Sequence, residues 1–384
     1  MSETIAFIQF KQRININVRE TYPHYKILLI TSKELLVSMT EFQTQFDKVI
    51  EIESLNEIKA KVPGEENIKY LTNDEYCLEV CELLNLRIDT YKQYYRNKLK
   101  MKDMLSKAKI LVPRYIDLCD YKDQKLESIV PILADELRFP LVIKPKEEAN
   151  NRGVSIVYDS NNLQEKLTEI YSHISAYQAE EYVVGDLYHC NIVNYKDENN
   201  IVQIGQYIND PIYLQSGIPI GSKTLSEADD RASTIQEFCL KVAKVLKLKR
   251  NSVTHLEFFI DSNSNCVFLE MAHRAPGGLV SEMSYYHSGV QLEKLNFDFQ
   301  ISGDQADFKL NDVKQETAWL WFPRKYLELH QEKLELAKLQ TLSNLYQFDY
   351  AITSNENPSD IQQGLILTNP CFTTRDSDLS LYLF

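Results

Sequence analysis

Two glutamates, Glu257 and Glu270, are the residues whose type and spacing most directly indicate chemistry. They lie in residues 251–278, where two apolar, strand-like runs flank the turn sequence SNSN. A hairpin centred on this turn places Glu257 opposite Glu270. Like charges that face each other in a ladder are destabilising unless a partner compensates them, and a divalent cation is the obvious partner. Carboxylates suit a hard ion such as Mg²⁺, which fills its other positions with phosphate oxygens and water.

The same hairpin register predicts two further cross-strand pairs, Phe259 with Phe268 and His255 with Ala272. All six side chains are then expected on one face of the sheet. Arg274 follows the second glutamate by four residues, at the strand exit, where it could reach an anion beside the metal. The alternative is a solvated hairpin whose glutamates point to water, and the hairpin alone leaves both interpretations open.

Two lysines elsewhere also indicate an anion site. Lys144 is embedded in an apolar run, where an unpaired ammonium is costly to bury, so an anionic partner is expected. Lys98 lies near the start of a predicted helix and could add charge to the anion preference of a helix N-terminus, although an ordinary surface lysine is the alternative. The loop 146–153 resembles a phosphate-covering lid with one glycine. Residues 276–278, Pro-Gly-Gly, let the backbone approach a bound group closely.

Strand-like and helix-compatible segments, which must position these residues, alternate along the chain. Short β-like runs in the first 95 residues, separated by polar helix-compatible segments, predict a small α/β layer; they are residues 5–10, 25–31, 48–52 and 68–71. No GxGxxG follows the first run, so nothing supports dinucleotide binding. Further on, the patterns predict a strand, loop and strand over 139–158, an amphipathic helix over 227–248 and a helix over 290–299.

Composition limits the class of protein. The 384 residues are 44% hydrophobic and 25% charged, which is typical of a soluble globular chain. A net charge of −13 without a dominant basic cluster disfavours a nucleic-acid partner. The seven scattered cysteines predict neither a disulfide framework nor a zinc site. We find no signal peptide and no apolar run long enough to span a membrane, so we expect a cytoplasmic protein.

Five motifs together resemble the ATP-grasp superfamily, specifically its carboxylate–amine ligase branch, similar to bacterial L-amino acid ligases. In chain order they are NKLKMKDMLSKAKILVP, FPLVIKP, NNRGV, AEEYVVGDLYHCNIV and THLEFF with FLEMAHRAPGG. Each is weak alone, but their order and intervals over about residues 95–300 are specific. The resemblance implies an α/β (α+β) ATP-grasp fold that begins with a Rossmann-like pre-ATP-grasp domain (1–95). The ATP-grasp domain would follow (96–310) and would combine a mobile lid (about 115–180) with a mixed-sheet subdomain. The C-terminal portion (311–384) would pack on that core.

The resemblance also implies a role for each candidate site residue. The expected nucleotide contacts are Lys98, Lys144 and Gly153 at the phosphates, Glu180 and Val183 at the adenine, and His189 near the ribose. The expected metal ligands are Glu257 and Glu270. The expected substrate contacts are Arg274, Gly277 and Gly278, and His255 would orient substrate or accept the amine proton. Several positions depart from the common pattern, among them Asn191, which stands where the branch has an aspartate. Leu187 replaces a ribose-binding glutamate, and Ala272 replaces an asparagine ligand, as it often does in the amino acid ligase branch.

The activity implied is ATP-dependent activation of a carboxylate as an acyl phosphate, followed by attack of an amine to give an amide, ADP and phosphate. The cofactors would be ATP and one or two Mg²⁺, with Mn²⁺ as an alternative, and the partners a small carboxylate and a small amine; a homodimer is compatible. Chemistry of the biotin-carboxylase or carbamoyl-phosphate type is one rival. A non-catalytic nucleotide-binding protein is the other, favoured by the glycine-poor lid and by Leu187.

Overall fold

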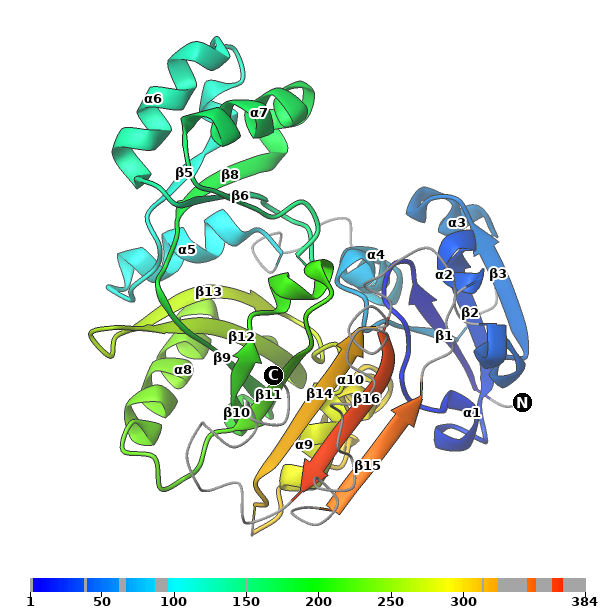
Figure 1. Ribbon diagram of the computed structural model, residues 1–384. Coiled ribbons are helices and arrows are strands. Elements are labelled where there is room, and N and C mark those ends of the chain that lie inside the picture. The colour runs from blue at the N-terminus through cyan, green and yellow to red at the C-terminus, as the bar shows by residue number, and fades with distance from the viewer. Residues whose placement is uncertain are drawn as a thin grey trace.

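A computed structural model describes residues 3–37, 40–61, 67–86, 96–149, 151–312, 314–323, 344–349 and 361–368. The described chain forms three sheets (Figure 1). A small antiparallel sheet with its helices stands at one end of a large central sheet, and a parallel sheet lies beside it. The expected α/β (α+β) class is confirmed. The residue boundaries given above for the domains stay predictions.

The parallel sheet has the strand order β3-β2-β1-β4, formed by β1 (Thr4–Gln9), β2 (Lys26–Ser32), β3 (Lys48–Ile52) and β4 (Ile68–Leu71). Its first two strands are buried almost throughout, as expected for near-continuous apolar runs covered on both faces. The helices of this part are α1 (Val18–Thr21), α2 (Lys33–Val37), α3 (Ile58–Lys61) and α4 (Leu78–Leu86). All four predicted strands are confirmed.

The lid sheet has the order β5-β8-β6-β7, formed by β5 (Tyr115–Asp117), β6 (Leu141–Pro145), β7 (Ser155–Val157) and β8 (Tyr177–Glu181). Helices α6 (Leu126–Leu137) and α7 (Ser160–Ile170) pack on it around a separate apolar core. Helix α5 (Lys98–Lys107) precedes this unit, and its N-cap Asn97 accepts a hydrogen bond from the Lys100 N–H. The predicted strand, loop and strand over 139–158 is confirmed.

The central sheet has eight strands in the order β13-β12-β9-β10-β11-β14-β16-β15. They are β9 (Gly185–Tyr195), β10 (Glu198–Asn209), β11 (Ile220–Thr224), β12 (Ser252–Asp261), β13 (Cys266–Ala272), β14 (Thr317–Pro323), β15 (Asn344–Asp349) and β16 (Ile361–Thr368). The last three strands therefore extend the same sheet that carries the two glutamates, and the remaining residues after 323 lie outside the described part of the chain.

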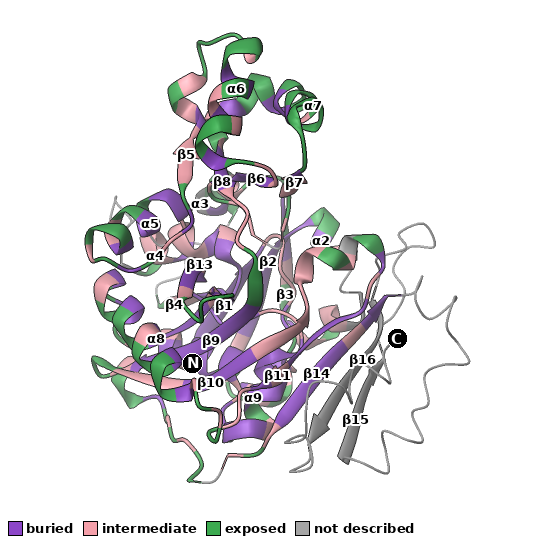
Figure 2. Ribbon diagram, turned by 60° about the vertical axis from the view of Figure 1, so that its left-hand side comes forward, coloured by how far each residue is buried: buried purple, intermediate pink, exposed green. Residues whose placement is uncertain are grey.

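Helices cover the two faces of the central sheet differently. On one face, α8 (Ala232–Leu246) and α5 pack on the apolar side chains of β9, β12 and β13, which confirms the predicted amphipathic helix. On the other face, α9 (Val280–Ser288) and α10 (Leu292–Ser302) cover part of the surface. Figure 2 shows that buried residues dominate the middle of this sheet, whereas the outer surfaces of α6 and α7 are largely exposed.

One predicted strand pair is wrong. Phe259 faces Val267, and Phe268 faces Phe258, because the register of the hairpin shifts at a β-bulge that leaves Leu269 as the extra residue. The bulge turns Phe268 to the opposite face from the glutamates, where it is fully buried with Phe258 in the core under α8. On the face that carries the glutamates, the next cross-strand pair is therefore Phe259 with Val267.

No helix in the described ranges is long and apolar enough to cross a membrane.

Candidate active site

Glu257 and Glu270 are direct cross-strand partners in the β12–β13 ladder, as predicted, and His255 faces Ala272 two residues further along. Glu257 is held by Tyr207, whose hydroxyl donates to Oε1 at 2.7 Å. Burial, followed by the charge of Glu257, raises the Tyr207 pKa well above its ordinary value, so Tyr207 remains a hydrogen-bond donor. The floor of the site is therefore a pair of carboxylates on neighbouring strands.

Lys98 reaches this floor from the first turn of α5. Its Nζ lies 3.2 Å from Glu270 Oε2 and donates to the Glu148 carbonyl oxygen in the lid loop at 2.6 Å. Burial alone would lower the Lys98 pKa, but Glu270 and Glu75 outweigh it and raise that pKa. Lys98 is consequently a fixed positive charge between the sheet and the lid, and is not the ordinary surface lysine considered from sequence.

Lys144 and Glu180 form a second charged cluster, inside the lid sheet. Lys144 Nζ lies 2.9 Å from Glu180 Oε2, and Glu180 is also ion-paired with Lys102, which is fully buried one helical turn after Lys98. Burial lowers the pKa of Lys144 to about 8, and the charge of Glu270 opposes that shift. The anionic partner expected for Lys144 from sequence is present.

A chain of side-chain hydrogen bonds fixes the ring of His255. Asn191 donates through Nδ2 to Gln203 Oε1 at 2.8 Å, so its Oδ1 is left to accept from His255 Nδ1, also at 2.8 Å. A neutral His255 then carries its proton on Nδ1, and its Nε2 lone pair lies 3.5 Å from Glu257 Oε1. This nitrogen can accept a hydrogen bond or a proton on the polar face of the sheet.

His189 is fully buried on β9, where it is the cross-strand partner of Glu257 on β12. Ser222 Oγ accepts from Trp319 Nε1 at 2.7 Å and contacts His189 Nε2 at 2.8 Å. Burial lowers the His189 pKa well below its ordinary value, so the imidazole is neutral. Its surroundings are protein side chains, and the ribose role stays a prediction.

Arg274 is buried just beyond the end of β13. Its Nη2 lies 3.4 Å from Glu75 Oε2, and its Nη1 donates to the Ala275 carbonyl oxygen at 2.9 Å. The loop that follows contains Gly277, around which a side chain would meet nothing within 4 Å, and Gly278, which has φ +63°. A guanidinium such as that of Arg274 is a group that binds anionic substrate groups.

Two residues expected at the nucleotide site, Gly153 and Val183, would act through their backbone and not through a side chain. Gly153 closes the lid loop with φ +72°, and a Cβ there would lie 2.9 Å from Pro145 Cγ, so this turn favours glycine. Val183 lies in the connection between Glu181, the last residue of β8, and Gly185, the first of β9. It is outside the ladders of both sheets, so its peptide groups are placed at the junction of lid and core.

Sequence reasoning missed Lys102, Tyr207 and Glu75. The signal for Lys102 was present, since it follows Lys98 by four residues and shares the helix face that carries Leu105. Tyr207 lies in β10, and no local pattern indicates that its hydroxyl reaches Glu257. Glu75 lies in the parallel-sheet part, and no local pattern connects it with Arg274, 199 positions further along the chain.

Within the described ranges, no group of three or more His, Cys, Asp or Glu side chains is arranged to hold a metal. The arrangement instead provides two oxygen-donor carboxylates with Lys98 beside them. This donor set fits a hard cation that takes one or two ligands from the protein and the others from phosphate and water. The geometry can therefore position and neutralise a polyphosphate.

Comparison with known proteins places these residues in a family. The model of the family "D-ala D-ala ligase C-terminus" matches residues 104–298. D-alanine–D-alanine ligase A of Bacillus cereus is 33% identical over 95 residues, which are 25% of this chain and 30% of the relative. A D-alanine–D-alanine ligase of Lactococcus lactis is 23% identical over 173 residues, 43% of this chain and 48% of that one. The matches thus span less than half of these relatives' lengths.

Solved structures share the whole fold at low identity. N5-carboxyaminoimidazole synthetase from Staphylococcus aureus has a TM-score of 0.70 at 14% identity, over 99% of this chain and 97% of that one. L-amino acid ligase from Bacillus licheniformis has a TM-score of 0.68 at 12% identity, over 99% and 96%. Because these identities are low, they show the ATP-grasp fold alone. With just over half of its length matched by the family model, the chain belongs to the D-ala D-ala ligase C-terminus family.

Proposed function

We propose that the protein is an ATP-dependent carboxylate–amine ligase that acts on amino acids. It would transfer the γ-phosphoryl group of ATP to a carboxylate oxygen to give an acyl phosphate and ADP. An amine would then attack the acyl carbon, forming the amide and releasing phosphate. The observation that carries the proposal is the Glu257–Glu270 pair with Lys98 Nζ 3.2 Å from Glu270. Membership in a ligase family and the ATP-grasp fold support it.

Mg²⁺ is the cation that the donor set suits, and Glu257 and Glu270 would hold it. When bound, it would neutralise charge on the transferring phosphoryl group. Glu270 is ion-paired with Lys98 in the free protein, so the two side chains stabilise each other until nucleotide arrives. Mn²⁺ should substitute, because it accepts the same oxygen ligands.

Lys98 and Lys144 would provide most of the positive charge that the protein places near the nucleotide phosphates. Lys98 lies against the lid loop and Lys144 on the lid strand β6, so the two ammonium groups approach a nucleotide from the lid side. Phosphoryl transfer needs positioning and charge neutralisation more than covalent help from the protein. Gly153 would let the loop backbone approach the phosphates, and the backbone from Glu180 to Val183 would present hydrogen-bonding groups to the adenine.

Arg274 and His255 would act on the substrates. Arg274 is assigned to the acyl phosphate and to the oxyanion that forms when the amine attacks, with Gly277 and Gly278 leaving room for the substrate. His255 would receive the proton that the amine loses, because its hydrogen bond to Asn191 leaves the Nε2 lone pair available on the polar face. Closure of the lid would exclude water, which otherwise hydrolyses an acyl phosphate.

The test is a phosphate-release screen with Mg-ATP and pairs of amino acids, with the products identified by mass spectrometry. We expect phosphate release only when a carboxylate substrate is present, and a product mass equal to the two substrates minus water. Glu270→Ala should abolish release. The exposed Glu165→Ala in α7 is the matched control and should leave it unchanged.

Two results would contradict the proposal. Incorporation of labelled bicarbonate into product would instead indicate carboxylase-type chemistry, which the structural likeness to carboxyaminoimidazole synthetase makes worth testing. Tight ATP binding without phosphate release, across a broad panel of acids and amines, would indicate a nucleotide-binding protein without ligase activity.

A further inference from the structure

Three polar side chains form a row across neighbouring strands of the central sheet. His255 on β12, Asn191 on β9 and Gln203 on β10 are direct cross-strand partners in the two ladders. The row begins at His255, beside Glu257, and both amides are almost completely buried. Buried amides are costly unless hydrogen bonds compensate them, so the bonds within this row account for their presence.

A β-bulge in β10 brings Gln203 into the row. Ile201 is the partner of Ile192, and Gln203 is the partner of Asn191, so Val202 is the additional residue of β10. A regular ladder would place Val202 opposite Asn191. Val202 instead packs in an apolar cluster with residues of α10. The bulge therefore gives Asn191 a polar cross-strand partner where it would otherwise have an aliphatic one.

The two amides are oriented in the same direction. Asn191 Nδ2 donates to Gln203 Oε1 at 2.8 Å, which leaves Asn191 Oδ1 to face His255. Gln203 Nε2 is buried and has no hydrogen-bond partner among the described residues. Gln203 also lines a cavity of about 30 Å³, which has room for a water molecule that would accept from this nitrogen. Because each amide donates on one side and accepts on the other, turning one of them would turn both.

The ring of His255 lies between two hydrogen-bond acceptors. Asn191 Oδ1 is 2.8 Å from Nδ1, and Glu257 Oε1 is 3.5 Å from Nε2. A neutral imidazole carries one proton, so it can donate to one of these two oxygens. The contact with Asn191 has the length of an ordinary hydrogen bond, and the contact with Glu257 is longer. Asn191 therefore holds the proton on Nδ1.

We propose that Asn191 and Gln203 are positioning residues, which keep the proton of His255 on Nδ1 so that Nε2 is free to accept the proton of the attacking amine. The inference rests on the ligase function proposed above. Without the two amides, the carboxylate of Glu257 would attract the ring proton to Nε2. His255 would then donate to a proposed metal ligand and could not accept from the amine. The row thus decides whether His255 can act as a base.

NMR spectroscopy of the metal-free protein tests the proton position without turnover. In protein with ¹⁵N-labelled histidine, protonated and unprotonated ring nitrogens give different signals, and His255→Gln identifies the signals of this ring. We expect the proton on Nδ1 in the wild type and on Nε2 in Asn191→Leu, because Glu257 is then the remaining acceptor. Asn191→Asp keeps an oxygen opposite Nδ1 and should keep the proton there. A wild-type ring with its proton on Nε2 would overturn the inference.

Two further variants separate the row from its surroundings. Gln203→Met removes the acceptor of the Asn191 amide, which can then turn, so we expect part of His255 to carry its proton on Nε2. Asn194→Leu is the matched control, because Asn194 is a buried amide on the same strand that donates to Asn199 at 3.1 Å, outside the row. It should show the wild-type spectrum. A Gln203→Met protein with that same spectrum would refute the role of Gln203.

Kinetics with substrate pairs from the phosphate-release screen test the consequence for catalysis. Asn191→Leu should lower kcat for amide formation by about tenfold, part of the contribution of a general base, and leave the KM for ATP unchanged. Asn194→Leu should change neither value. Wild-type kcat in a variant whose ring proton has moved would refute the positioning role and leave the ligase function standing. Absence of turnover with every substrate pair would refute the ligase function, and the spectra would still decide which nitrogen carries the proton.

Discussion

Lys144 Nζ and Glu180 Oε2 lie 2.9 Å apart on neighbouring strands of the lid sheet, and both residues are almost completely buried. Lys102 joins them from helix α5, so one carboxylate compensates two ammonium groups. Replacing a buried charge that has such partners leaves the partners unpaired in a low-dielectric environment. The lid and α5 are therefore held together by an electrostatic contact that centres on Glu180.

Glu180→Gln should lower the free energy of unfolding by about 3–5 kcal/mol, because two buried lysines lose their carboxylate. Denaturant unfolding monitored by circular dichroism measures this. Glu181→Gln is the matched control, since its partner Arg114 is more than half exposed, and it should cost less than about 1 kcal/mol. Equal effects of the two substitutions would show that Glu180 is not the central charge of the cluster.

Lys98→Met should reduce kcat/KM for ATP by about 100-fold, because it removes a charge placed for the transferring phosphoryl group. Lys100→Met, two residues further along the same helix and exposed, should leave it within about twofold of wild type. Both values come from phosphate-release kinetics at saturating amino acid. Similar losses in the two variants would mean that the effect belongs to the helix and not to the Lys98 ammonium.

Gly205→Ala should destabilise the protein by about 1–3 kcal/mol, because the new methyl group would lie 2.4 Å from His189 Nε2 and displace the ring from Ser222. Gly277→Ala meets nothing within 4 Å and should leave the thermal unfolding midpoint unchanged. Differential scanning calorimetry compares the two. A Gly205→Ala protein as stable as wild type would show that His189 moves freely, contrary to the packed arrangement.

Local patterns predicted much of the fold and of the site floor. The strands of the first 95 residues, the 139–158 hairpin and helix α8 follow from period and apolar runs. The Glu257–Glu270 pair followed from turn position and alternation. The bulge at Leu269 did not, because a one-residue insertion in a strand leaves no mark in an apolar sequence such as VFLEM.

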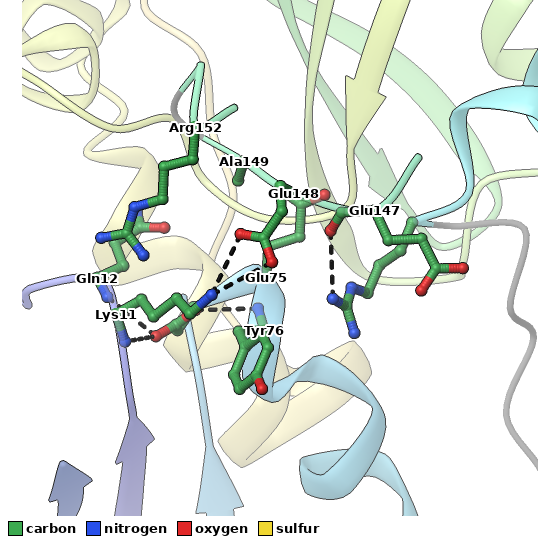
Figure 3. A pocket seen from close by; sticks show the side chains of 10 residues that line it. Lys11, Gln12, Glu75, Tyr76, Glu147, Glu148, Ala149 and Arg152 are labelled. Atoms are coloured by element: carbon green, nitrogen blue, oxygen red, sulfur yellow. Dashed lines mark hydrogen bonds and ion pairs between the residues drawn. The ribbon is translucent and has the colours of Figure 1, made fainter. Parts of the chain in front are cut away.

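Contacts between distant parts of the chain were beyond sequence reasoning. Glu75 and Arg274 meet because the parallel-sheet part docks beside the end of β13, and nothing in either local sequence encodes that docking. Lys102 was recognisable as a helix neighbour of Lys98, but its partner Glu180 lies on β8 of the lid sheet, 78 positions further along the chain. The pocket that Gln12 and Arg152 line likewise depends on how the lid loop meets the loop after β1 (Figure 3).

Glu293, in α10, hydrogen-bonds to the parallel-sheet part of the chain. It is fully buried, and its Oε2 accepts from the backbone N–H groups of Asn15 at 2.9 Å and Ile16 at 3.1 Å. Burial, together with the nearby Glu282 carboxyl, raises the Glu293 pKa from 4.5 to about 8. The folded protein therefore keeps a proton at neutral pH that the unfolded chain has already lost.

This difference predicts how stability changes with pH. Between the unfolded pKa of 4.5 and the folded value of about 8, the folded state binds the additional proton, so the stabilising contribution of Glu293 is complete below this window and is lost as pH rises through it. The loss is at most about 1.4 kcal/mol per pH unit. Glu293→Gln cannot ionise, so its thermal midpoint should rise relative to wild type between pH 5 and 8. The exposed Glu165→Gln should follow the wild-type curve. Parallel curves for wild type and Glu293→Gln would mean that this carboxyl is ionised in the folded protein throughout the range, stabilised by its two backbone donors.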